Sequence, residues 1–358
     1  MSARWRADVW DAAQQGDAGA LMGLLGSRQP AGLSTTFVAS TVHWGLKVAI
    51  ANDYAPCVDA LTRALPRGAS LFLQVSRHGC QTPLDLAASC GSLQTVNALL
   101  ADDRPALSLV APSSTLRFAA QDGHADVVQA LLDAKAAVRL DTLPAATAGG
   151  DARTVRILLG AKASANARSS GWRSGLTPLF AAVMHGCTAD VVDQLVRAKA
   201  DPNDSRSTVT REGDDTPLHL AAMHCRAPAV RVLLEAKANV NALNRVSYTP
   251  LHCAAMIADP AVCNWLVAFK ADVHASARGS TPLHTAVSLA NAPCVVALVK
   301  AGADLEAING WGHTPLQAVQ SDTSCRYAAR LHVIQALVAA KASVHASKAL
   351  PLARRTYQ

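Results

Sequence analysis

The chain has 358 residues, half of them apolar and only 4 % aromatic, so it can bury a sizeable core and is not a disordered tail. Its formal charge of +7 comes from 33 basic and 26 acidic residues, which are mixed along the chain without a run of five or six like charges. This pattern argues against a dedicated nucleic-acid-binding protein. Abundant alanine and few aromatic residues favour small, closely packed helices.

Nine cysteines are scattered along the chain without a Cys-x-x-Cys pair, which indicates neither a disulfide framework nor a zinc cluster. The first residues contain no apolar segment typical of a signal peptide, and nowhere do eighteen uncharged apolar residues follow one another. We therefore expect a soluble protein of a reducing compartment, with the cytoplasm as the default location and the nucleus as an alternative.

Two weakly similar units open the chain, VWDAAQQGDAGALMGLL from Val9 and LKVAIANDYAPCVDALTRAL from Leu46. A segment that begins Thr-Pro-Leu then recurs, and weaker copies from Thr115 and Leu143 lie between its first two occurrences. Its six copies are TPLDLAASCG at Thr82, TPLFAAVMHG at Thr177, TPLHLAAMHC at Thr216, TPLHCAAMIA at Thr249, TPLHTAVSLA at Thr281 and TPLQAVQ at Thr314. Aligned on the first small residue after the motif, ten units register at Ala12, Ala49, Ala87, Ala119, Ala146, Ala182, Ala221, Ala254, Ala286 and Val319.

Each unit is predicted to contain two short helices and a connector. A threonine hydroxyl can cap a helix, and proline fits the first helical position, where its missing N–H is not needed. Prolines also stand just before four of the second apolar runs, at Pro56, Pro228, Pro260 and Pro293. Because two short helices cannot bury their apolar faces alone, neighbouring units are expected to stack along one continuous core.

These units resemble the ankyrin repeat, whose hallmark is Thr-Pro-Leu-His-x-Ala at a period of 33 residues. The resemblance implies an all-α repeat fold, an ankyrin-type α-solenoid of stacked helix-turn-helix units with β-hairpin or loop fingers. We expect residues 1–350 to form a single ankyrin repeat array, with a capping repeat at the N-terminus, an irregular last repeat and a short tail at 351–358. The short spacing between Ala119 and Ala146 predicts a bend or a weak point near residues 135–150.

A lysine stands at the end of most second helices, where the ankyrin pattern has a glycine. A non-glycine residue in the left-handed conformation costs about 1–2 kcal/mol, and a cation at a helix C-terminus returns about 0.3–1 kcal/mol. We favour a structural interpretation, a solvated charge at a helix end, and keep attraction of an acidic partner as the alternative. Only Gly302 keeps the family residue, and the lysines are Lys135, Lys162, Lys199, Lys237, Lys270 and Lys341.

The resemblance also implies where a partner binds, because the two residues after the Ala-Ala pair of the first helix face the groove in ankyrin arrays. Methionine, an adaptable side chain favoured on recognition surfaces, occupies this position in three successive repeats. The alternative, that these methionines fill gaps in the core, stays open. The groove candidates are Met184, His185, Met223, His224, Met256, Ile257 and Leu289.

Connectors such as 241–248 and 306–313 are expected to project as fingers beside the first helices, again by resemblance. Tryptophan and arginine are typical anchors of interfaces. The finger residues added to the candidate partner-binding surface are Trp172, Arg173, Arg245, Arg278 and Trp311.

Three histidines, His219, His252 and His284, share one motif position in different repeats, and the resemblance implies hydrogen bonds near the threonine of each motif. The sequence contains no glycine-rich phosphate loop, nucleophile elbow or His-Glu-x-x-His motif. We therefore expect no enzyme activity, cofactor, metal or small-molecule ligand.

The leading functional hypothesis is a non-catalytic protein–protein interaction scaffold or adaptor that binds a protein partner through its concave groove and finger loops. An alternative is the substrate-targeting subunit of a larger enzyme complex such as a ubiquitin ligase, with catalysis on another chain. A third hypothesis, direct catalysis, would require a bound metal or cofactor.

Overall fold

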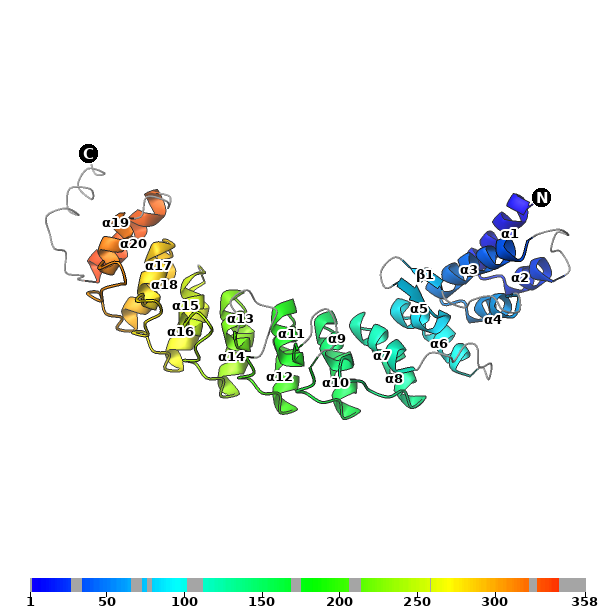
Figure 1. Ribbon diagram of the computed structural model, residues 1–358, viewed down its shortest axis with the longest axis horizontal. Helices are drawn as coiled ribbons and strands as arrows, with labels where there is room; N and C mark the ends of the chain where they lie inside the picture. Colours follow the sequence, from blue (N-terminus) through cyan, green and yellow to red (C-terminus); the bar gives the residue numbers. More distant parts are fainter. Residues whose placement is uncertain are drawn as a thin grey trace. The chain divides into compact units, whose positions relative to one another are not determined.

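Twenty α-helices and two short strands form the regular structure of the computed structural model (Figure 1). The structure describes residues 2–26, 34–65, 73–75, 79–101, 112–168, 175–205, 214–257, 259–321 and 327–340, to which this count refers. The chain forms two units, Met1–Ala167 and Arg168–Gln358, and each is described by itself. That residues 1–350 form a single array stays a prediction.

The first unit holds five consecutive helix pairs. They are α1 (Ser2–Gln15) with α2 (Ala18–Leu25), α3 (Thr35–Ala51) with α4 (Ala55–Arg63), α5 (Pro83–Cys90) with α6 (Leu93–Leu100), α7 (Pro112–Gln121) with α8 (Ala125–Asp133), and α9 (Thr142–Gly149) with α10 (Ala152–Gly160). Before α5, strand β1 (Leu73–Val75) pairs antiparallel with β2 (Gly79–Gln81), and Gln74 lies opposite Cys80.

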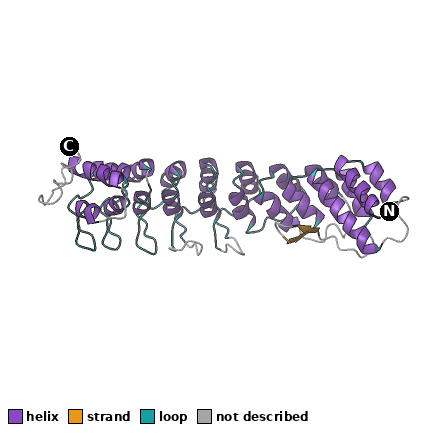
Figure 2. Cartoon of the chain, turned by 90° about the horizontal axis from the view of Figure 1, so that it is seen from above, coloured by secondary structure: helices purple, strands orange, loops and turns teal. Residues whose placement is uncertain are grey.

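The second unit repeats the same arrangement. Its pairs are α11 (Pro178–His185) with α12 (Ala189–Arg197), α13 (Pro217–Met223) with α14 (Ala227–Glu235), α15 (Pro250–Ala255) with α16 (Pro260–Ala268), α17 (Pro282–Ser288) with α18 (Ala292–Lys300), and α19 (Pro315–Ser321) with α20 (Tyr327–Ala339). Figure 2 shows these pairs side by side, with their connecting loops projecting on one side.

The first helices begin where the Thr-Pro motif predicts. In α13 the hydroxyl of Thr216 accepts a hydrogen bond from the backbone N–H of His219, and Pro217 is the first helical residue. The same cap opens α5, α11, α15 and α17. Each cap satisfies one of the backbone N–H groups that a helix start leaves without a partner.

Six second helices, α8, α10, α12, α14, α16 and α18, end in a left-handed residue, which is a lysine in the first five, as the lysine pattern predicts. At the end of α14, Lys237 has φ 64°, and its N–H donates to the carbonyl of Leu234 at 3.0 Å while Ala238 N–H donates to Leu233 at 2.9 Å. This pair of bonds is the Schellman motif, which normally uses glycine. The same conformation, with φ between 61° and 65°, occurs at Lys135, Lys162, Lys199 and Lys270, whereas Lys341 lies outside the described residues.

Stacking within each unit buries the small residue on which the repeats were aligned. Ala221 and Ala286 are fully buried, and all ten register residues, from Ala12 to Val319, belong to the core. In the second unit first helices contact first helices, from α11 to α19, and second helices contact second helices, from α12 to α20. An alanine at this position lets neighbouring helix pairs approach closely, and the apolar residues of both helices, such as Leu218 and Leu233, fill the space between them.

Three motif histidines of the second unit each tie one repeat to the next. The Nδ1 atom of His219 accepts a hydrogen bond from Thr216 N–H at 3.2 Å, and its Nε2 lies 2.9 Å from the carbonyl oxygen of Tyr248. A carbonyl can only accept, so Nε2 carries the proton and donates. The same geometry joins His252 to Ser280 and His284 to His313, so the structural role implied for these three side chains is confirmed.

Candidate recognition surface

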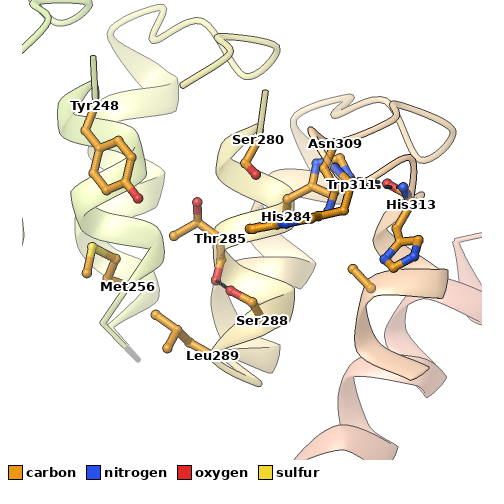
Figure 3. Close-up of a pocket in the computed structure, with 11 residues that line it drawn as sticks. Tyr248, Met256, Ser280, His284, Thr285, Ser288, Leu289, Asn309, Trp311 and His313 are labelled. Carbon is orange, nitrogen blue, oxygen red and sulfur yellow. Dashed lines mark hydrogen bonds between the residues drawn. The ribbon is translucent and has the colours of Figure 1, made fainter. Parts of the chain in front are cut away.

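The described part of the second unit carries a hollow of about 490 Å³ on the side of its first helices and fingers (Figure 3). Three of the residues predicted from the sequence, Met256, Leu289 and Trp311, meet in it. It therefore joins the groove and finger candidates of two successive repeats. The full lining is Tyr248, Met256, Ser280, His284, Thr285, Ser288, Leu289, Asn309, Trp311, His313 and Ala318.

The apolar part of the hollow consists of side chains that remain open to solvent. Met256 follows α15 and is 38 % exposed, and Leu289 follows α17 and is 49 % exposed. Both are the C-cap residues of their helices and directly follow residues that are largely buried. Exposed apolar side chains that adjoin one another in this way usually mark a contact surface.

A rigid turn presents Trp311 at the edge of the hollow. The side-chain oxygen of Asn309 accepts hydrogen bonds from the N–H groups of Trp311, at 3.0 Å, and His313, at 2.9 Å. The backbone N–H of Asn309 donates to the carbonyl of His313 at 2.9 Å and closes the loop. Asn309 is buried while Trp311 is 78 % exposed, so the turn holds an indole ring in solvent with its backbone already ordered.

The opposite wall is formed by Tyr248, which stacks on His252 with ring centroids 5.4 Å apart and an interplanar angle of 13°. Asn244 holds this turn in the same way as Asn309, since its side-chain oxygen accepts from Tyr248 N–H at 2.9 Å. Figure 3 shows the Tyr248 ring turned toward Met256 and Thr285, across the hollow from Trp311. The wall thus offers one hydroxyl and one aromatic face to a bound chain.

Sequence reasoning missed several lining residues. Tyr248, Ser280 and His313 each stand directly before the threonine of a motif, and Ser288 occupies the position of Met256 one repeat on. Aligning the repeats position by position would identify both the residue before each motif threonine and the residue that corresponds to Met256. A third signal lies in finger length. Thr281 follows Lys270 by eleven positions, whereas Thr249 follows Lys237 by twelve and Thr314 follows Gly302 by twelve.

The remaining candidates do not line this hollow. Met184 and Met223, at the ends of α11 and α13, are half-buried, and His185 and His224 beside them are exposed. Ile257 is half-buried, and its carbonyl oxygen accepts a hydrogen bond from the side chain of Asn291. The partner-binding roles of these residues stay predictions.

The finger arginines Arg245 and Arg278 are exposed on the turns that precede Tyr248 and Ser280. Trp172 and Arg173 fall in residues 169–174, outside the described part of the chain. In the described ranges we find no group of three or more His, Cys, Asp or Glu side chains placed to hold a metal ion. Nor does any helix among these residues have the length and apolar character needed to cross a membrane.

Comparisons with known proteins agree with the fold. A family model described as ankyrin repeats (3 copies) matches residues 116–206, 143–244, 189–277, 218–309 and 251–347, which together span more than half of the chain. The human Ankyrin repeat and SOCS box protein 16 is 29 % identical over 301 residues, covering 72 % of this chain. The match spans 64 % of that relative's own length, less than two thirds.

Two solved structures are similar to this chain. The crystal structure of the human ASB11 ankyrin repeat domain has a TM-score of 0.52 and 24 % sequence identity, and the match covers 63 % of this chain and 96 % of that domain. An ankyrin repeat domain from Acinetobacter baumannii AYE has a TM-score of 0.48 and 24 % identity, with 56 % of this chain and 98 % of that chain covered. The repeated Thr-Pro caps, the stacked helix pairs and the matched family model lead to one assignment: the chain belongs to the ankyrin repeat family.

Proposed function

We propose that this protein is a non-catalytic scaffold or adaptor that binds a partner protein through the first helices and fingers of its second unit. Ankyrin repeats are a protein–protein interaction module, which supports this general role. The observation that carries the proposal is the meeting of Met256, Leu289 and Trp311, all exposed, around one hollow of about 490 Å³. Large apolar and aromatic side chains that lose their contact with water on binding supply most of the free energy of such complexes.

A matched pair of substitutions tests this proposal. Met256→Glu places a charge in the hollow, whereas Val296→Glu places the same charge on α18, at a side chain that is 39 % exposed and does not line the hollow. We expect affinity purification from cells, followed by mass spectrometry, to recover a partner with the wild type and with Val296→Glu but not with Met256→Glu. Equal recovery with all three proteins would contradict the proposal.

Met223→Glu extends the test to the adjoining repeat. If the groove reaches α13, this substitution weakens partner recovery while the circular dichroism spectrum stays unchanged. A loss of helicity would instead assign the half-buried Met223 to the core.

A second candidate function is the substrate-targeting subunit of a larger enzyme complex such as a ubiquitin ligase. The similarity to a protein whose name joins ankyrin repeats to a SOCS box favours this candidate. Co-purification of an enzyme with the chain, in amounts that do not depend on the Met256 hollow, would distinguish a targeting subunit from a simple adaptor.

A further inference from the structure

We propose that the hollow around Met256, Leu289 and Trp311 binds an extended protein segment in which an apolar side chain is flanked by carboxylates. This inference rests on the proposed function and adds the chemistry of the partner. Two observations support it: the absence of acidic groups from the lining and the presence of two arginines without ion pairs on its finger turns.

The lining of the hollow is neutral. The eleven residues around it include no aspartate, glutamate, lysine or arginine. Trp311 and Tyr248 could each offer a ring face to a cation, but no carboxylate of the lining would neutralise that cation. An apolar side chain is therefore the better occupant, since Met256 and Leu289 gain contacts with it and no charge loses its hydration.

Two arginines lie on finger turns that precede lining residues of the hollow. Arg245 stands three residues before Tyr248, and Arg278 stands two residues before Ser280. The backbone of Arg278 also packs against the next finger, because a Cβ added to Gly310, the neighbour of Trp311, would lie 3.1 Å from the Arg278 carbonyl oxygen. Both guanidinium groups thus belong to the fingers that border the hollow.

Among the described residues, neither Arg245 nor Arg278 forms an ion pair or a side-chain hydrogen bond. Other arginines of this unit do, since Arg197 pairs with Asp193 at 2.8 Å and Arg231 with Glu235 at 3.5 Å. Guanidinium groups bind carboxylates through paired hydrogen bonds, which are the strong kind.

Three acidic side chains of the fingers accept hydrogen bonds from other finger residues. Asp215 is buried and accepts a hydrogen bond from the side-chain nitrogen of Asn244 at 2.8 Å. Asp272 accepts from the backbone N–H of His274, and Asp304 accepts from that of Glu306, both at 2.9 Å. The two arginines, which have no such partner among the described residues, are available to carboxylates of a partner segment whose apolar residue enters the hollow.

Fluorescence anisotropy with the full-length chain and a panel of labelled nine-residue peptides tests the inference. The panel places leucine or serine at the centre and aspartate, lysine or serine at the flanking positions. We expect the leucine peptide with aspartate flanks to bind most tightly, and its affinity to fall as salt is raised. The double variant Arg245→Glu/Arg278→Glu should weaken this peptide by about tenfold or more and favour the lysine-flanked peptide. Lys300→Glu, a charge reversal at the end of α18, is the control and should change neither affinity.

Equal binding of acidic and basic peptides, a preference for lysine flanks by the wild type, or binding of none of the peptides would overturn the inference. An equal loss with Lys300→Glu would overturn it as well. Recovery of the cellular partner tests the proposed function separately. If Met256→Glu abolishes recovery but Arg245→Glu/Arg278→Glu does not, the proposed function stands and only the inference about carboxylates fails. If Met256→Glu leaves recovery unchanged, the proposed function itself is wrong.

Discussion

Replacing the left-handed lysines by glycine should make this protein more stable. Lys199, Lys237 and Lys270 end three second helices of the second unit with φ between 64° and 65°. Each position costs about 1–2 kcal/mol because Cβ crowds the following carbonyl, and the lysine charge at the helix C-terminus returns about 0.3–1 kcal/mol. The net gain from glycine is about 1 kcal/mol per site before the extra entropy of glycine in the unfolded chain, which removes about half of it.

The triple variant should therefore gain about 1.5 kcal/mol in the free energy of unfolding. For a unit of this size, 1 kcal/mol corresponds to about 2–4 °C in melting temperature, so we expect a rise of about 3–6 °C by circular dichroism. The binding of a partner should not change, because these exposed side chains lie away from the lining of the hollow.

Three further variants separate backbone strain from charge. Gly302 has φ 85°, and a Cβ added there meets no atom within 4 Å, so Gly302→Lys would introduce the strain without a clash and should lower the melting temperature. Lys237→Ala removes the charge and keeps the strain, so it should be neutral or slightly destabilising. Lys300→Gly removes a similar charge from the last turn of α18, where glycine costs about 1 kcal/mol. If the triple variant melts at or below the wild-type temperature while Gly302→Lys is neutral, the strain argument is wrong. A sharp loss of partner affinity in the triple variant would instead show that the lysines bind the partner.

Three further predictions follow from the packing. Burial lowers the pKa of the three motif histidines, so the stability that their neutral forms give is complete above about pH 6.5. As pH drops from there toward the folded pKa values, the free energy of unfolding should fall by at most about 1.4 kcal/mol per pH unit for each histidine. Urea titrations between pH 7 and pH 5 measure this fall, and a flat profile would contradict the role of burial. Gly279→Ala should destabilise the protein more than Gly312→Ala, although both glycines have positive φ. A Cβ on Gly279 would lie 2.8 Å from the backbone of the next finger, whereas a Cβ on Gly312 would meet no atom within 4 Å. Equal urea midpoints of the two variants would refute this prediction. Iodoacetamide should modify the exposed Cys90 in the native protein well before the fully buried Cys263 and Cys294, and mass spectrometry showing equal rates would mean that the α16–α18 contact opens readily.

Much of the fold could be predicted from the sequence because its determinants are local. A Thr-Pro pair caps a helix within one turn, and an alanine at a fixed position in each repeat marks the buried contact between neighbours. The left-handed lysines were predictable for the same reason, since the apolar run before Lys237 and the alanine after it define the helix end.

The hollow could be predicted only in part, because it depends on the lengths of three successive fingers relative to one another. The finger that ends at Thr281 is one residue shorter than its neighbours, and the walls come from Tyr248 on one side and Trp311 on the other. No single repeat contains this information. Periodicity therefore predicted that Met256 and Leu289 share a surface but did not distinguish them from Met223, which lies outside the hollow.

The histidine ties also determine how the second unit would respond to force. Each tie crosses from one repeat to the next, through His219, His252 and His284, so elements pulled from the two ends are loaded in series and carry the same tension. The last described pair, α19 and α20, has Gln317 in the histidine position, and among the described residues it packs against α17 and α18. Stretching in an optical trap would then release α19 and α20 before the pairs that have a histidine tie to both neighbours, and would lengthen the protein in steps of one repeat.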